Sequence, residues 1–320
     1  MKSENGLSAR CEVNVISQPV LPKWEIKQVS AGGYHTMILK TDGSLWACGN
    51  NKYGQLGDGT SEDHSILTQV MTDVAYVSAG TNHTMILKTD GTLWACGRNE
   101  DGELGDKTTT NRYTPVLVMK DVAFVSASTR PSNYNGGHTM ILRSDGVLFG
   151  CGHNFYGELG VKGWSSKSTP VEIMDNVATV SAGGSHTMII KNDGSLWACG
   201  LNDCGQLGNG TESGYGEGIF TPEKIMTDVA SVSAGGNHTM IIKNDGSLWA
   251  CGLNGSGQLG DNTTVHQSSG TLKLIMNGVA AVSAGSSHTL VLRKDGTLCC
   301  FGDNYYGPAA CTAACSCLTR

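Results

Sequence analysis

The amino-acid sequence predicts an all-β fold, a β-propeller built from four-stranded blades, and three observations carry this prediction. The chain of 320 residues contains 44 glycines, and only 16% of its residues are charged. It repeats one unit six times, and a fixed repeat period of this kind decides an architecture. Within each unit, short apolar runs alternate with turn signals, and no helical period of about 3.6 residues survives the glycine spacing.

The repeat is clearest in the dipeptide His-Thr, whose copies recur about every 50 residues. An Asp-Gly pair follows each copy in the same phase. Six copies of the unit cover nearly everything from Val20 to Gly307. The histidines of the six copies are His35, His83, His138, His186, His238 and His288.

The second copy shows how one unit divides into four strands. Val74 to Ala79 is rich in β-branched residues, and Thr84 to Lys88 is an apolar run. Asp90-Gly91 is a strong hairpin signal, and Leu93 to Cys96 follows it as the third strand. Pro115 to Met119 is the fourth. Four antiparallel strands that recur about every 50 residues are typical of a propeller blade.

The spacing within each unit resembles the regulator of chromosome condensation repeat. No Trp-Asp pair closes each unit, as it would in WD repeats. The copies also do not match the double-glycine spacing of kelch repeats well. Members of the resembled family close with seven blades, so the six units indicate either a six-bladed ring or a seven-bladed type lacking one blade. The residues that carry the resemblance are Ala79-Gly80-x-x-His83-Thr84, Asp90-Gly91-x-Leu93 and Gly97-x-Asn99-x-x-Gly102-x-Leu104-Gly105.

Two features depart from the resembled repeat. Cysteine stands where the family places an aromatic residue before the glycine of the third strand, as at Cys96. The sixth unit breaks after Gly307, where an Ala/Cys-rich tail begins. The predicted organisation is therefore an N-terminal lead-in (1–17), one propeller domain (18–307) and an atypical tail (308–320).

Composition excludes several classes of partner. The formal net charge is −6 and the basic residues are scattered singly, so the basic stripe that nucleic-acid binding needs is missing from the sequence. No apolar run is long enough to indicate a membrane span, and no secretory signal precedes the repeats. We expect a cytoplasmic monomer with reduced thiols.

The residues common to every copy are expected to be scaffold. The six histidines are spread around a ring, so we expect each to serve backbone groups of the adjoining blade and not a metal. The cysteines are expected to be buried free thiols, because equivalent positions on successive blades are too far apart for disulfides. Glycine before the histidine is expected to allow positive φ and close approach. No cofactor is expected.

The residues that differ between copies point to a binding face. With up-and-down strands, the Ala-Gly-x-x-His turn and the Asn-x-x-Gly loop emerge at the same end of a blade. The two insertions, Ser128 to Asn135 and Glu212 to Phe220, fall at that end too. Variable loops on a rigid scaffold usually carry recognition, and aromatic residues dominate interface energetics. The predicted partner-binding residues are Tyr53, Arg130, Tyr134, Phe155, Tyr156, Tyr215, Tyr305 and Tyr306.

No catalytic signature competes with this interpretation, since the sequence has no Walker-type loop, G-x-S-x-G elbow or H-E-x-x-H motif. We therefore expect a non-catalytic scaffold that binds a protein partner. The family resemblance implies two alternatives: a guanine-nucleotide exchange factor acting on a small GTPase, and a proteinaceous enzyme inhibitor. Fold-level analogy does not choose among the three.

Overall fold

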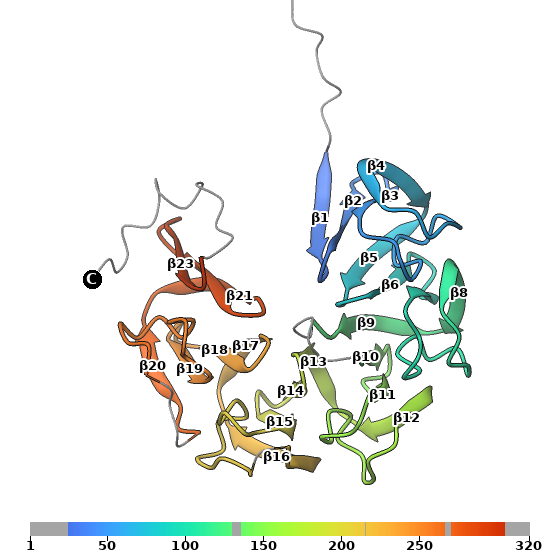
Figure 1. The fold of residues 1–320 in the computed structure, drawn as a ribbon. Coiled ribbons are helices and arrows are strands. Elements are labelled where there is room, and N and C mark those ends of the chain that lie inside the picture. Colours follow the sequence, from blue (N-terminus) through green and yellow to red (C-terminus); the bar gives the residue numbers. More distant parts are fainter. Residues whose placement is uncertain (1–24, 130–135, 215, 266–269, 305–320) are drawn as a thin grey trace, which may run out of the picture.

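The computed structural model describes residues 25–129, 136–214, 216–265 and 270–304, and within these ranges every regular element is a β-strand. The strands form six antiparallel sheets that follow one another around a common axis (Figure 1). Five sheets have four strands, and the described part of the sixth has three. The predicted all-β, six-repeat propeller is confirmed. The boundaries predicted at 17 and 307 fall outside the described residues.

Each sheet is a meander in which consecutive strands pair. The innermost strands are β1 (Ile26–Ala31), β5 (Val74–Ala79), β9 (Val122–Ala127), β13 (Val177–Ala182), β17 (Val229–Ala234) and β21 (Val279–Ala284). The second strands are β2 (His35–Lys40), β6 (His83–Lys88), β10 (His138–Arg143), β14 (His186–Lys191), β18 (His238–Lys243) and β22 (His288–Arg293). The third strands are β3 (Leu45–Gly49), β7 (Leu93–Gly97), β11 (Leu148–Gly152), β15 (Leu196–Leu201), β19 (Leu248–Gly252) and β23 (Leu298–Gly302). The outer strands are β4 (His64–Met71), β8 (Arg112–Met119), β12 (Lys167–Met174), β16 (Gly218–Met226) and β20 (Lys273–Met276).

The repeated Asp-Gly pair makes the hairpin between the second and third strands, as the sequence predicts. In the first blade, Gly43 has a φ of 79°, a value that favours glycine. The Asp42 carboxylate accepts hydrogen bonds from the N–H and the hydroxyl of Ser44. That hydroxyl in turn accepts a 3.0 Å bond from the Trp46 indole N–H. The turn therefore orients a partly buried tryptophan against the sheet.

The core lies between the blades, because neighbouring sheets pack face to face. Between the first and second blades, Met37, Leu39 and Leu45 meet Val77 and Ile86, and all five are fully buried. Four further clusters of the same kind fill the next four junctions. Burying a side chain of this size contributes about 1.5–3 kcal/mol. The period-2 alternation of each strand thus serves two junctions at once.

The repeated histidines join neighbouring blades through threonine, which corrects the expectation that they bond backbone groups directly. His186 Nε2 lies 2.9 Å from Oγ1 of Thr239 in the next blade. Because Thr239 donates its own hydroxyl proton to the Gln206 carbonyl, Nε2 of His186 must be the donor. The same histidine-to-threonine contact recurs in pairs His35–Thr84, His83–Thr139, His138–Thr187 and His238–Thr289.

In every copy but the third, which has Ser128 instead, the glycine three residues before the histidine is needed for space and not for positive φ, which corrects half of its predicted role. Gly183 has no φ in the left-handed region, but a Cβ there would lie 2.4 Å from Cε1 of His186. Gly235 stands in the same relation to His238, also at 2.4 Å. The imidazole therefore packs directly on the glycine of its own turn.

The cysteines that precede the third-strand glycine are free, and the prediction that they are buried is confirmed for Cys96, Cys151, Cys199 and Cys251, whereas Cys48 of the first blade is only half-buried. Cys96 is buried, and its thiol lies 3.7 Å from the Gln55 carbonyl of the preceding blade. Burial raises its pKa to about 12. Within the described residues, no helix has the length and apolarity needed to cross a bilayer.

The threonine of this inter-blade contact can be tested against a matched position in the first blade. We expect Thr239→Val to destabilise the protein by about 2 kcal/mol, because His186 and the Gln206 carbonyl both lose a buried partner. Thr36→Val should cost less than about 0.5 kcal/mol, since Thr36 is half-buried and no blade precedes it within the described residues. Urea unfolding of both variants measures the difference; equal losses would contradict this role of the contact.

Candidate functional site

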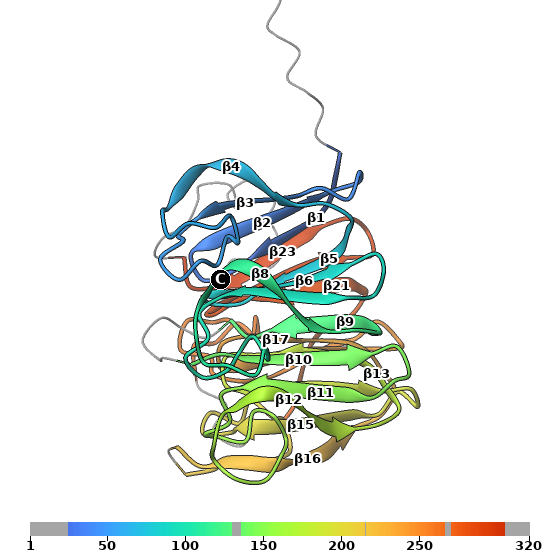
Figure 2. The same ribbon diagram turned by 90° about the vertical axis from the view of Figure 1, so that its right-hand side faces the viewer.

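One end of the propeller carries the loops that differ between blades, and we call it the loop face. It comprises the turns between first and second strands and the connections from third to outer strands, such as 50–63. The two are hydrogen-bonded: Asn50 N donates to the Tyr34 carbonyl at 2.8 Å. At the opposite end, Val74 N donates to the Gly43 carbonyl of the hairpin turn. Figure 2 shows the ring from the side, with the longer connections gathered on its left.

A buried asparagine in each of the first five blades holds the loop face rigid. In the third blade, the Asn154 amide donates to the Val161 and Gly163 carbonyls, and its oxygen accepts from Leu159 N. Asn154 is fully buried. The two residues that follow it are therefore presented outward from a fixed turn.

Those two residues are Phe155 and Tyr156, and with His153 they form the aromatic cluster. The Phe155 and Tyr156 rings meet edge to face with centroids 5.1 Å apart. The His153 ring lies 6.3 Å from Phe155 and 6.1 Å from Tyr156. Phe155 is 53% exposed, which is high for a large apolar side chain on a rigid turn. The nearby Trp164 is 71% exposed.

The carboxylate of Glu158 holds the aromatic cluster in place through two hydrogen bonds. One carboxylate oxygen lies 2.8 Å from His153 Nδ1, and the other accepts a 2.9 Å bond from the Tyr156 N–H. Glu158 is buried, so its charge needs these partners. A single buried carboxylate therefore orients both the histidine ring and the backbone that carries the exposed aromatic residues.

The equivalent place in the second blade holds a charged network. The guanidinium of Arg98 is buried and donates to the carboxylates of Glu100, Asp101 and Glu103. Burial opposes the charge of Arg98, but the field of Glu103 and the bonds to the other two carboxylates raise its pKa. Burial also raises the pKa of Glu103. With three carboxylates around one cation, this part of the loop face is acidic.

The two networks border the same glycine, Gly136, at the blade junction. A Cβ on Gly136 would lie 2.7 Å from His153 and 2.9 Å from Asp101, so both side chains border that glycine. The Ser166 hydroxyl also reaches Asp101, at 3.4 Å. The aromatic cluster of the third blade and the acidic network of the second blade are therefore neighbours on the loop face.

The structure brings together only part of the predicted site. Phe155 and Tyr156 lie in the aromatic cluster, whereas Tyr53 lies in the first blade with the Lys52 ammonium 5.5 Å from its ring centre. The remaining five lie outside the described residues and stay predictions: Arg130, Tyr134, Tyr215, Tyr305 and Tyr306.

Sequence reasoning missed His153, Glu158, Arg98 and Glu103. A signal for them exists in the differences between copies. The copies with glutamate in the Gly-x-Leu-Gly ending, Glu103 and Glu158, are the copies with arginine or histidine before the asparagine. Elsewhere that ending has glutamine, as at Gln206. Such paired variation within one chain indicates a buried ion pair.

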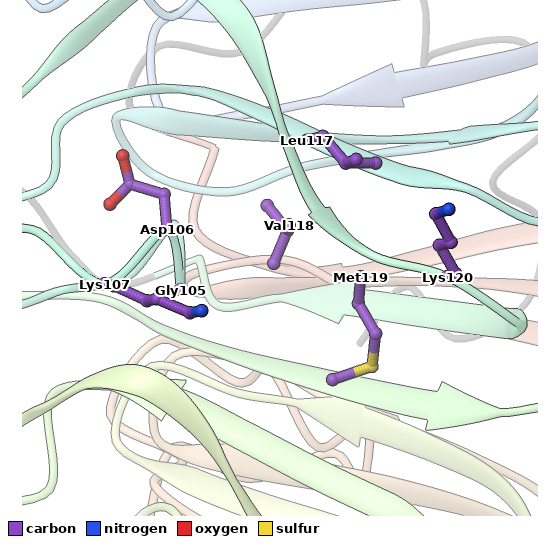
Figure 3. Close-up of a pocket in the computed structure, with 7 residues that line it drawn as sticks. All are labelled: Gly105, Asp106, Lys107, Leu117, Val118, Met119 and Lys120. Atoms are coloured by element: carbon purple, nitrogen blue, oxygen red, sulfur yellow. The ribbon is translucent and has the colours of Figure 1, made fainter.

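A shallow hollow of about 400 Å³ lies on the outer edge of the second blade, away from the aromatic cluster. Figure 3 shows Gly105, Asp106 and Lys107 on one side of it and the strand segment from Leu117 to Lys120 on the other. The Asp106 carboxylate is already bonded to Arg112 and Thr108. The described residues contain no group of three His, Cys, Asp or Glu side chains placed to hold a metal ion.

Comparisons with known proteins agree with the geometry. A family profile described as an RCC1-like domain matches residues 73–316. The profile of the regulator of chromosome condensation (RCC1) repeat matches residues 26–55 and 42–87. An RCC1 repeat-containing protein of Schizosaccharomyces pombe is 53% identical over 32 residues, which are 10% of this chain and 9% of that protein. The chain thus matches only a small part of that relative's length.

Several solved structures share the fold. Yeast RCC1 (Prp20), solved bound to Kap60, is 21% identical with a TM-score of 0.75, over 87% of this chain and 70% of that one. Prp20p of Saccharomyces cerevisiae, described together with its binding to Gsp1p and histones, is 21% identical with a TM-score of 0.76, over 87% and 72%. Human WBSCR16 is 23% identical with a TM-score of 0.70, over 84% and 72%. At these identities the likeness shows the fold alone.

Proposed function

Since the chain belongs to the family of RCC1-like domains, we propose that it is a non-catalytic scaffold that binds a protein partner through its loop face. The observation that carries the proposal is the aromatic cluster, in which Phe155 is held exposed by a turn that Asn154 and Glu158 fix from within. A rigid, exposed aromatic side chain loses little conformational entropy on binding. Such residues are the usual anchors of protein interfaces.

The charge around the cluster favours a particular kind of partner. Glu100 and Asp101 pair with Arg98, Asp101 borders the same glycine as His153, and the whole chain carries a net charge of −6. A partner that presents lysine or arginine side chains near an apolar anchor would complement this surface and associate faster at low salt. We therefore place the interface over the second and third blades.

Removing the aromatic anchors tests this interface. We expect the double variant Phe155→Ala plus Tyr156→Ala to retain less than about a tenth of the partner captured by the parent chain from a native lysate, since interface anchors cost about 2 kcal/mol or more. Phe155→Ala alone, which leaves the Tyr156 ring beside His153, should already lose most of the captured partner. The matched control is Ile66→Ala plus Leu117→Ala, which alters exposed residues of the outer strands β4 and β8. Undiminished capture by the double variant would contradict the proposed face.

Guanine-nucleotide exchange is a second candidate, because Prp20p, which shares this fold, binds Gsp1p. A nucleotide-release assay against small GTPases separates it from a plain scaffold. Accelerated release that Phe155→Ala plus Tyr156→Ala abolishes would support exchange through the same face. The enzyme-inhibitor alternative, the monomeric state and the cytoplasmic location stay predictions.

A further inference from the structure

An asparagine followed by a glycine is a chemically labile pair. The backbone nitrogen of the glycine can attack the side-chain carbonyl of the asparagine and close a cyclic imide. Glycine has no side chain to hinder that approach, and asparagine is a thermolabile residue. The chain contains five such pairs. Three lie in the described residues and begin at Asn209, Asn254 and Asn277, whereas those at Asn5 and Asn135 lie outside them.

Two of the three described pairs are held by hydrogen bonds. The Asn209 oxygen accepts from the N–H and the hydroxyl of Thr211, and its amide group donates to Glu223. Asn254 is fully buried, and its oxygen accepts from the N–H of Leu259. Neither side chain can turn toward the nitrogen of the following glycine without breaking these bonds.

The Asp-Gly pairs of the hairpin turns could close the same cyclic imide, and they are held in the same way. In the fifth blade, the Asp245 carboxylate accepts from the N–H and the hydroxyl of Ser247. The N–H of Gly246 donates to the Lys243 carbonyl at 2.9 Å. In the other five hairpin turns the glycine N–H also donates to the carbonyl three residues earlier. The nitrogen that would react is therefore occupied in every hairpin.

Asn277 and Gly278 lack these restraints within the described part of the chain. There, the exposed Asn277 side chain makes no hydrogen bond, and the N–H of Gly278 donates to no acceptor. A Cβ on Gly278 would meet nothing within 4 Å, so the space beside the pair is open. Asn277 can therefore approach the Gly278 nitrogen without breaking a contact.

This pair lies in the turn between β20 and β21, which joins the fifth sheet to the sixth. Both sides of the turn are fixed. Met276 ends β20 and pairs with β19, and the N–H of Val279 donates to the Gly246 carbonyl at 3.0 Å. The Gly278 carbonyl accepts a 2.8 Å bond from the N–H of Lys294. An additional backbone atom between these anchors would displace at least one of them.

We propose that Asn277 is a site of spontaneous deamidation, and that the reaction loosens the attachment of the sixth blade to the fifth. The Gly278 nitrogen loses its proton to hydroxide and forms a bond to Cγ of Asn277. The bond from Cγ to the amide nitrogen breaks, and that nitrogen takes a proton from water and leaves as ammonia. Water then opens the cyclic imide. Attack at Cγ gives aspartate, whereas attack at the main-chain carbonyl gives isoaspartate, whose backbone runs through Cβ and is one atom longer.

The corresponding turns of the other blades do not contain the pair. The residues in the place of Asn277 are Thr72, Lys120, Asp175 and Thr227. Gly278 has a φ of 73°, and aspartate adopts a similar φ in three of these turns, as Asp228 does at 64°. The fold therefore requires neither the asparagine nor the glycine, and both can be exchanged to test the proposal.

Peptide mapping of the purified full chain, incubated at pH 8, follows the reaction at each pair. We expect isoaspartate, detected by methylation with a protein isoaspartate methyltransferase, to form at Asn277 at least ten times faster than at Asn209 or Asn254. In the chain unfolded in urea the three rates should converge, because the hydrogen bonds that protect two of the pairs are then lost. A folded chain in which Asn277 reacts no faster than Asn209 would overturn the proposal.

Two variants move the reactive pair from one turn to another. Asn277→Thr, which takes the residue of the preceding turn, should form no isoaspartate between β20 and β21. Thr227→Asn plus Asp228→Gly should create a new site between β16 and β17, with a rate similar to that at Asn277, since both residues are exposed there. If the transplanted pair does not react, the openness of this turn does not decide reactivity and the proposal is wrong.

The incubated chain tests the structural consequence. The parent should acquire a lower Tm and faster hydrogen exchange in β21 and β22, whereas Asn277→Thr incubated beside it should lose less. Because both chains keep the other four pairs, the difference isolates Asn277. Freshly prepared Asn277→Asp, which has the new charge but not the longer backbone, should keep the Tm of the fresh parent. Equal losses in the incubated parent and Asn277→Thr would overturn the loosening of the sixth blade. None of these results bears on capture by the aromatic cluster.

Discussion

Acidification from pH 7 to pH 4.5 is expected to unfold this protein, because the junction histidines are buried in the neutral form. Burial lowers the pKa of His35 and His238 to about 4 and that of His83 and His186 to about 3. In the unfolded chain the same groups titrate near their ordinary value of about 6.5. Between these values the unfolded state binds more protons than the folded state, so stability falls as pH falls.

The size of this effect follows from the shifts. Each histidine removes about 1.4 kcal/mol per pH unit below pH 6.5, hence about 3 kcal/mol at pH 4.5. Four such groups together remove about 10 kcal/mol, which is comparable to the whole stability of a typical domain. The structural cause is clear at His186 and His238. Their buried Nδ1 atoms have no hydrogen-bond partner, so an N–H formed there by protonation would have no acceptor.

Urea unfolding between pH 7 and pH 5 measures this dependence, and one variant isolates a single histidine. His186→Gln keeps a donor near the position of Nε2 toward Thr239 but cannot titrate. Its stability should therefore fall less steeply with decreasing pH, by about 1.4 kcal/mol per pH unit. An unchanged slope would show that His186 does not drive acid unfolding.

The second large effect is expected at the glycine that follows the cysteine in the third strand of a blade. Gly200 has a φ of 105°, and a Cβ on it would lie 2.6 Å from both the Cα of His186 and the carbonyl oxygen of Ser185. We expect Gly200→Ala to cost about 3 kcal/mol or more, from the strain of positive φ and from overpacking against a rigid backbone. Thermal and urea unfolding of the variant measure this cost.

The matched control is Gly194 in the hairpin of the same blade. Its φ is 75°, but a Cβ there would meet nothing within 4 Å. Gly194→Ala should therefore cost only about 1 kcal/mol, which is the conformational part alone. Equal losses in the two variants would mean that crowding by the neighbouring strand contributes nothing at Gly200.

Much of the fold could be predicted because the six copies act as an internal comparison. The Asp-Gly turns and the alternating apolar runs place the strands within a few residues, as for β5 (Val74–Ala79), which the structure reproduces. The scaffold role of the cysteines also followed from their recurrence, since a residue needed in every blade cannot belong to one site. These properties depend on neighbours close in sequence.

The candidate site was only half predictable. Phe155 and Tyr156 were found as variable residues on a turn, but their support by Glu158 and their continuity with Arg98 were not. Those contacts join side chains from different loops and different blades. The residue types and their spacing within one loop do not reveal which side chains of the neighbouring blade lie against that loop.

The sequence by itself determined the repeat, the strands, the turns and the loop face, because each depends on hydrogen bonds and apolar alternation within one unit of about 50 residues. The tertiary structure alone decided which identical residues are buried. His83 and His288 share one motif, yet the first is buried and the second exposed, because burial depends on whether another blade follows. The contacts that bury a residue come from the neighbouring blade, about 50 residues away in the chain, so a single repeat does not determine them.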